Sequence, residues 1–183
     1  GLVRPLEISS GDLWPKHVYM TYKDLSRVPS YVHEALRKYA PGYNVTWFDD
    51  KDSLEYMRRH STAPELAAYQ SIQSGAHRAD MWRYQILRTH GGIYLDADIV
   101  LKRPLDEVFP DRRFAYTAIA NIATSRKGPC IFQAVLASPP GNPIFHVLVG
   151  KMVRTVQSGS TYSYGTFVRQ FYALLNAKSK YSD

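Results

Sequence analysis

The sequence predicts an α/β protein in which helices flank a mostly parallel β-sheet. Three observations predict this class. Segments rich in β-branched and aromatic residues alternate along the chain with segments that have helical spacing and helical caps. Glycine and proline separate many of these segments, and 183 residues with 45% hydrophobic content can bury a core without disulfides. Strands that alternate with helices favour a parallel sheet covered on both faces.

Each element is predicted from its local pattern. Strands are expected over residues 14–22, 43–48, 93–101, 114–119 and 130–136. Helices are expected over residues 26–39, 49–60, 76–90, 143–156 and 164–175, with a shorter helix after Pro64. Pro29 fits the first turn of the first helix, and Gly91-Gly92 ends the helix over residues 76–90. Such sheets bind ligands at the carboxyl ends of their strands, where we expect the site.

Charge is distributed unevenly along the chain. The net charge is +7; residues 1–111 carry 14 basic and 15 acidic side chains, whereas residues 112–183 carry 9 basic and 1 acidic. The first part therefore holds the carboxylates for metal or acid–base chemistry, and the second offers cations for phosphate, nucleic acid or an anionic membrane. A single cysteine, Cys130, excludes internal disulfides and cysteine-based zinc sites. No apolar run approaches the roughly 20 residues that span a bilayer, so we expect no transmembrane segment.

Two aspartates mark the predicted strand over residues 93–101. Asp96 and Asp98 are two positions apart, so on a strand their side chains share one face. Two carboxylates among apolar residues are costly unless a cation compensates them. A divalent ion such as Mn²⁺ or Mg²⁺, which keeps water and substrate phosphate as further ligands, is one such cation. The alternative is a strand end at which both aspartates face water.

The preceding helix carries a second charged pair. Asp80 and Arg83 are three positions apart, so they lie on one face of the helix and can form an ion pair. The planar guanidinium of Arg83 also fits phosphate or sugar oxygens. Because Gly91-Gly92 turns the chain sharply into the next strand, we expect Asp80, Arg83 and Asp96 to approach one cleft.

The segment that joins these residues resembles a known family. From Arg78 to Asp98 the chain reads Arg-Ala-Asp-x-x-Arg-Tyr-x-x-Leu-x-x-x-Gly-Gly-Ile-Tyr-Leu-Asp-x-Asp. It is similar to the signature of glycosyltransferases of the family-32 type, which have a DXD sugar-nucleotide site. That family includes the fungal initiating mannosyltransferases and is related to the glucosylating clostridial toxins. The resemblance covers about residues 14–106 and implies a single GT-A domain, a Rossmann-like fold, over residues 1–183, with its C-terminal part truncated or reduced.

The resemblance assigns the catalytic chemistry to four residues. Asp98 would bind Mn²⁺ or Mg²⁺ that bridges the two phosphates of the donor, and Asp96 would contact the ribose and the metal. Asp80 and Arg83 would hold hydroxyl groups of the donor sugar. These roles are what the family implies for the matching positions of this chain.

The resemblance also implies residues around the donor nucleotide. Tyr94 would lie beside the sugar or the nucleoside, and Thr21 and Tyr22 would line the pocket of the base. The chain departs from the family at Gln133, where an asparagine is usual. A third protein ligand for the metal is not assigned.

The predicted activity is metal-dependent transfer of a hexose from a UDP- or GDP-linked donor to a glycan or glycoprotein acceptor, with retention of anomeric configuration. A metal and nearby cations would stabilise the leaving diphosphate, and the basic candidates are Arg126, Lys127, Lys151 and Arg169. The expected partners are the sugar nucleotide and the acceptor, with no nucleic acid. Members of the resembled family occur in the Golgi lumen, in bacteria and in viruses, so the compartment stays open.

Other functions fit parts of the pattern. A degenerate member of the family would bind the sugar nucleotide without turnover. A phosphatase of the haloacid-dehalogenase type also has a strand-borne D-x-D, but it needs a later acidic pair, and only Asp183 is acidic after Asp111. A nucleic-acid-binding domain would explain the pI of about 9.5, but no recognised nucleic-acid motif is present.

Overall fold

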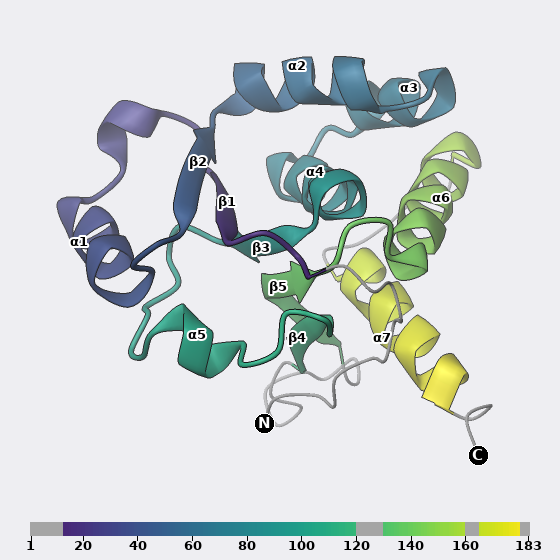
Figure 1. Ribbon diagram of the computed structural model, residues 1–183. Coiled ribbons are helices and arrows are strands. Elements are labelled where there is room, and N and C mark those ends of the chain that lie inside the picture. The colour runs from purple at the N-terminus through teal and green to yellow at the C-terminus, as the bar shows by residue number, and fades with distance from the viewer. Residues whose placement is uncertain (1–12, 120–129, 160–164, 180–183) are drawn as a thin grey trace.

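A five-stranded sheet forms the centre of the computed structural model, which describes residues 13–119, 130–159 and 165–179 (Figure 1). The strands are β1 (His17–Thr21), β2 (Asn44–Phe48), β3 (Gly92–Leu95), β4 (Tyr116–Ile119) and β5 (Ile131–Ser138). Their order across the sheet is β2-β1-β3-β5-β4. The sheet thus places β3, which precedes the two aspartates, in the middle.

The strand directions bring the start of β5 to the edge at which β1 and β3 end. β1 pairs in parallel with β2 and β3, with Val18 opposite both Val45 and Ile93. β5 runs antiparallel to β3 and to β4. Four of the five described strands therefore point the same way, which confirms the prediction of a mostly parallel sheet.

Helices cover both faces of this sheet. The helical segments are η1 (Leu25–Arg27, a 3-10 turn), α1 (Ser30–Tyr39), α2 (Asp50–His60), α3 (Ala63–Ser71), α4 (Gly75–His90), α5 (Leu105–Val108), α6 (Pro143–Gln157) and α7 (Thr166–Ser179). α1 and α5 pack on one face, and α2, α3, α4, α6 and α7 pack on the other (Figure 1). Within the described residues, every helix falls short, in length or apolar content, of what crossing a bilayer requires.

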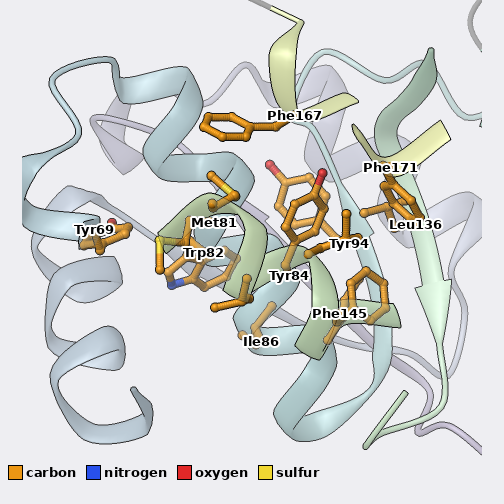
Figure 2. Close-up of a cluster of buried hydrophobic side chains, with 14 of the residues drawn as sticks. Tyr69, Met81, Trp82, Tyr84, Ile86, Tyr94, Leu136, Phe145, Phe167 and Phe171 are labelled. Carbon is orange, nitrogen blue, oxygen red and sulfur yellow. The ribbon is translucent and has the colours of Figure 1, made fainter. Parts of the chain in front are cut away.

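α4 lies deep in the larger of the two hydrophobic cores. Every residue from Met81 to Leu87 is buried. Figure 2 shows Trp82, Tyr84 and Ile86 packed in the cluster that also contains Phe145 of α6 and Phe171 of α7. Side chains on this helix are therefore fixed in place by packing on several sides, which limits their freedom to reorient.

Two glycines turn the chain from α4 into β3. Gly91 and Gly92 have φ values of 64° and 97°, in the left-handed region that strains other residues. A Cβ atom at Gly91 would lie 2.6 Å from the backbone nitrogen of Pro140, and one at Gly92 would lie 2.8 Å from the backbone oxygen of His17. The predicted stop at this pair is confirmed, and it depends on both backbone conformation and close packing.

The strand that carries the aspartates is shorter than predicted. β3 ends at Leu95, after which the backbone N–H of Asp96 donates to the carbonyl oxygen of Ala134 at 2.9 Å. The N–H of Ile99 then donates to the carbonyl of Asp96 at 3.1 Å and closes a turn. Asp96 and Asp98 thus follow the strand, and the prediction that they share one strand face is wrong.

Two further differences concern the helices. The predicted helix over residues 26–39 is divided, because Val28 and Pro29 are both extended, with ψ values of 123° and 141°. Extended backbone is expected directly before a proline, which here ends the 3-10 turn and precedes α1. The short helix α5 was not predicted, and the predicted start of the last helix at Tyr164 lies outside the described residues.

Candidate active site

A buried arginine joins the predicted site residues. Arg83 and Asp80, both on α4, are only 5% and 8% exposed. Nη2 of Arg83 lies 3.4 Å from Oδ1 of Asp80 and 3.4 Å from Oδ1 of Asp96. The guanidinium carbon also lies 4.4 Å from the centre of the Tyr94 ring, a cation–π contact. The expected meeting of Asp80, Arg83 and Asp96 is therefore present in the structure.

The donors of Arg83 are largely committed inside the protein. Nε donates to the carbonyl oxygen of Ala79 at 3.2 Å, and Nη1 donates to the carbonyl oxygen of Gln133 at 2.8 Å. Burial opposes the charge of Arg83, but Tyr94, Asp80 and Asp96 outweigh burial and raise its pKa. Arg83 is thus a fixed cation that holds two carboxylates, and two of its nitrogens are bonded to backbone carbonyls.

Asp80 is held in an environment that disfavours its charge. Burial raises the pKa of its carboxyl group, although the charges of Arg83 and His77 and a hydrogen bond from Gln133 act in the opposite direction. A buried carboxylate that keeps a cationic partner can stay ionised and still offer an oxygen to a ligand. Perturbed carboxyl groups of this kind are concentrated at functional sites.

Tyr94 reaches the site from the core. Its side chain is 1% exposed, and its hydroxyl donates to Oδ1 of Asp96 at 2.5 Å. The hydroxyl also lies 3.3 Å from Oγ1 of Thr21, at the end of β1. Burial raises the pKa of Tyr94, so the phenol keeps its proton and supports the negative charge of Asp96. The structure therefore places Tyr94 next to Asp96 and Thr21, with its ring inside the core.

Two cavities adjoin neighbouring faces of α4. The larger cavity, of about 440 Å³, is lined by Thr21 and Tyr22 after β1 and by Arg78 and Trp82 of α4. Asp50 of α2 also lines it, with Oδ2 at 4.0 Å from Nη2 of Arg78. Thr21 and Tyr22, the two residues predicted to line the base pocket, thus share one cavity.

The smaller cavity, of about 290 Å³, has a charged part and an apolar part. Asp80, Arg83 and Asp96 line it together with Gln133 of β5. Apolar lining comes from β5 and α7, with contributions from Ile131, Phe132, Ala134 and Val168. The predicted sugar residues thus share a cavity that is distinct from the one at Thr21 and Tyr22.

The two aspartates of the motif differ in surroundings. Asp96 has a counter-charge in Arg83 and a side chain that is 33% exposed. Asp98 lies in the turn and is exposed, and none of the described hydrogen bonds or ion pairs involves its side chain. Asp96 therefore has a counter-charge within the protein, which the contact with Arg83 supplies.

Sequence reasoning missed two polar residues of the site. Gln133 was noted only as a departure from the family pattern, and Tyr84 was not singled out, yet both are hydrogen-bonded next to Asp80. Among the expected basic residues, Arg126 and Lys127 lie outside the described residues. Arg169 of α7 lies against Gly165, which lines the smaller cavity.

Comparison with known proteins decides the family of this region. Residues 26–115 match the family model described as a glycosyltransferase sugar-binding region containing a DXD motif. This region belongs to that glycosyltransferase family. The matched residues contain α4, the glycine pair, β3 and both aspartates, so the DXD resemblance seen in the sequence is confirmed.

Relatives of the chain are glycosyltransferases from a virus and from fungi. The chain is 28% identical over 141 residues to an uncharacterized glycosyltransferase of Acanthamoeba polyphaga mimivirus, covering 76% of this chain and 54% of that protein. It is 30% identical over 107 residues to the initiation-specific alpha-1,6-mannosyltransferase of Candida albicans, covering 51% and 26%. It is 29% identical over 136 residues to the mannosyl phosphorylinositol ceramide synthase of Saccharomyces cerevisiae, covering 73% and 33%. The chain thus spans about half or less of the length of these relatives.

A solved structure shares the fold. The PaToxG glycosyltransferase superimposes with a TM-score of 0.58 at 15% sequence identity, covering 92% of this chain and 76% of that one. At this identity the likeness concerns the fold alone. It agrees with the mixed sheet and flanking helices described above and confirms the expected GT-A architecture.

Proposed function

We propose that this protein is a metal-dependent glycosyltransferase that transfers a hexose from a UDP- or GDP-linked donor to a glycan or protein acceptor, with retention. The observation that carries the proposal is the buried cluster of Asp80, Arg83 and Asp96 beside a cavity, in a region of the DXD glycosyltransferase family. A sugar site requires polar side chains that converge on a cavity, and a carboxyl group with a shifted pKa is typical of such sites.

The two cavities suggest where the nucleoside and the sugar of the donor would bind. The larger one, with Thr21 and Tyr22 at the end of β1, would receive the nucleoside. The smaller one would receive the hexose, whose hydroxyl groups can donate hydrogen bonds to the carboxylate of Asp80. Asp96 contributes to the wall of the smaller cavity and is tied through Tyr94 to Thr21 in the larger one, so the diphosphate would lie between them.

Asp96 and Asp98 fit a metal ion that substrate phosphates help to coordinate. Oδ1 of Asp96 is engaged by Tyr94 and Arg83, which leaves its other oxygen available, and Asp98 is exposed. Over the described ranges, no three His, Cys, Asp or Glu side chains form a complete protein cage. Ions such as Mg²⁺ usually bind through one or two carboxylates plus water and phosphates, so this donor set suits them. Bound there, the ion would neutralise charge on the diphosphate.

The chain's own residues would orient the reacting groups. The bond between the anomeric carbon and the diphosphate breaks with its electron pair leaving on the diphosphate, while the acceptor oxygen bonds to the same carbon. In the retaining mode, the acceptor proton passes to the departing diphosphate. Asp80 would hold the sugar while positive charge develops at the anomeric carbon, and Arg83 keeps Asp80 and Asp96 in fixed positions.

A panel of sugar nucleotides tests the proposal. The names of the two fungal relatives place mannosyl donors first, so GDP-mannose would be compared with UDP-linked hexoses in the presence of Mn²⁺. Nucleotide release and a shift in melting temperature are the two measurements. We expect one donor to give both. If donors bind but no combination of donor and acceptor releases nucleotide, the degenerate family member would be favoured instead.

A further inference from the structure

Gln133 connects the proposed sugar site to the hydrophobic core. Its Nε2 donates to Oδ1 of Asp80 at 2.5 Å, and its Oε1 accepts a hydrogen bond from the hydroxyl of Tyr84. Gln133 and Asp80 are each 8% exposed, and Tyr84 is fully buried. Figure 2 shows Tyr84 within the core, with its hydroxyl pointing the same way as that of Tyr94. Both core tyrosines therefore present a hydroxyl to the site.

The chemistry of this chain of groups allows one orientation of the amide. Oδ1 of Asp80 accepts the hydrogen bond here, so the NH₂ end of Gln133 faces Asp80. The carbonyl end then faces Tyr84, whose hydroxyl donates. Burial, with the negative charge of Asp80, raises the pKa of Tyr84 well above its usual value, so this hydroxyl keeps its proton. Tyr84 thereby selects the orientation in which Gln133 supports Asp80.

Gln133 also fixes Arg83, the other member of the buried pair. Its backbone carbonyl accepts from Nη1 of Arg83 at 2.8 Å. Oδ1 of Asp80 therefore receives a hydrogen bond from Nε2 of Gln133 and faces Nη2 of Arg83, and Arg83 is itself bonded to the backbone of Gln133 on β5. In the part of the chain that the structure describes, no hydrogen bond is recorded at Oδ2 of Asp80. Oδ2 is then the oxygen left for a ligand in the smaller cavity.

We propose that Tyr84 and Gln133 are positioning residues for Asp80, which lock its carboxylate so that one oxygen is satisfied within the protein and the other is presented to a sugar hydroxyl. This inference rests on the proposed function for its substrate. Tyr84 is fully buried and reaches the cavity only through Gln133. Groups that orient a ligand-binding side chain in this way typically change affinity or activity by about 10- to 100-fold when removed.

The substitution Tyr84→Phe removes the hydroxyl and keeps the ring in contact with Phe145 and Phe171. We expect kcat of transfer to fall by about 10- to 100-fold, while Kd for the nucleoside diphosphate stays unchanged because the nucleoside occupies the other cavity. Gln133→Met, which keeps length and removes both hydrogen bonds, should give the same pattern. Tyr116→Phe is the matched control. This buried tyrosine of β4 is hydrogen-bonded to Asp111, away from the site. This variant should leave kcat unchanged.

A double-mutant cycle separates positioning from general loosening of the core. If Tyr84 acts through Asp80, Tyr84→Phe should have less than about a twofold effect in the Asp80→Asn background, since the carboxylate it positions is gone. Independent effects that multiply in the double variant would overturn the proposal. An equal loss of nucleoside diphosphate affinity in Tyr84→Phe would also overturn it.

A second measurement keeps the two proposals distinguishable. If no donor is turned over by the unmodified protein, the proposed function fails. Hydrogen exchange at the side-chain amide of Gln133, followed by NMR, then tests whether Tyr84 and Gln133 are paired. We expect the amide proton that bonds Asp80 to be protected from hydrogen exchange in the unmodified protein and in Tyr116→Phe, and to lose that protection in Tyr84→Phe, where Gln133 loses the partner that fixes its orientation. Unchanged protection in Tyr84→Phe would contradict the pairing irrespective of the enzymatic activity.

Discussion

Buried ionisable groups lie toward both ends of α4, but their surroundings differ. Toward its start, Arg83 keeps its charge beside Asp80 and Asp96, although burial raises the pKa of Asp80. At its last residue, His90 lies in an aromatic cluster, with ring centres 5.4 Å from His60 and 6.4 Å from Tyr19. The first end balances opposite charges, whereas the second gathers rings.

Burial disfavours the charged form at both ends, but the partners of the buried groups differ. At the histidine end, burial lowers the pKa of His90, and His60 and His17 lower it further; burial also lowers the pKa of His17. These imidazoles therefore favour the neutral form. At the acidic end, burial raises the pKa of Asp80, while the charge of Arg83 acts in the opposite direction. The difference teaches that a buried ionisable group has support for its charge only where a fixed opposite charge is built in, and such a place can bind a polar ligand.

The largest expected effect comes from breaking the charged end. Asp80→Asn and Arg83→Lys should each lower sugar transfer by about 10²- to 10³-fold, while nucleoside diphosphate binding changes less than about twofold. The loss arises because one removes the carboxylate and the other removes the planar guanidinium that holds both Asp80 and Asp96. Steady-state kinetics and calorimetry check it.

The matched control is Arg88→Lys, at another well-packed arginine on the same helix. Arg88 donates two hydrogen bonds to Glu65 at 2.8 and 3.0 Å, away from the aspartates of the motif. This variant should lower the melting temperature without changing transfer. Normal turnover by Asp80→Asn or Arg83→Lys would make that residue structural.

The next effect concerns Asp98, the exposed carboxylate beside the charged end. Asp98→Ala should weaken Mn²⁺-dependent binding of nucleoside diphosphate by a factor on the order of 10², because a two-carboxylate site loses one of its protein ligands. Calorimetry with and without Mn²⁺ measures it. Glu107→Ala, at an exposed acidic residue of α5, is the control and should bind normally. Equal affinity in EDTA would remove the metal from the proposal.

A smaller effect is expected at the glycine that follows the histidine end. Gly91→Ala should lower the free energy of unfolding by about 2–4 kcal/mol, since it combines left-handed backbone strain with a clash against Pro140. Gly42→Ala is the control, with a similar φ of 77° but nothing within 4 Å of the added carbon. That variant should cost only about 1 kcal/mol. Chemical denaturation of both variants compares them, and equal losses would mean that packing at Gly91 adds nothing.

The smallest effect is a pH dependence at the histidine end. Since the pKa values of His17 and His90 are lowered in the folded protein, the unfolded chain binds more protons below about pH 6.5. Their contribution to stability is therefore present above pH 6.5 and is lost as the pH falls below it. The drop in melting temperature between pH 7.5 and 5.5 should shrink by about one or two degrees in His90→Asn, an effect limited by solvent screening.

The control for this pH effect is His146→Asn, at an exposed position of α6. Its melting temperature should depend on pH as in the unmodified protein. An identical pH dependence in His90→Asn and the unmodified protein would show that the cluster does not contribute, and the contrast between the two ends of α4 would then rest on the acidic end alone.

The sequence by itself determined the features that depend on neighbouring residues. α4 and its glycine stop follow from helical spacing and from backbone conformations that only glycine adopts without strain, and the motif from Arg78 to Asp98 lies within one short stretch. The alternation of strands and helices was enough to predict an α/β fold with a mostly parallel sheet.

Only the tertiary structure decided what lies next to the charged end. The antiparallel pairing of β5 with β3 brings Gln133 to Asp80, about fifty positions away in the chain. The bond from the N–H of Ile99 to the carbonyl of Asp96 closes a turn after β3, in which Arg83 contacts Asp96 and Asp98 lies exposed. These contacts depend on which segments pair across the sheet, and a local residue pattern does not specify the partner of a strand edge or the counter-charge of a buried carboxylate.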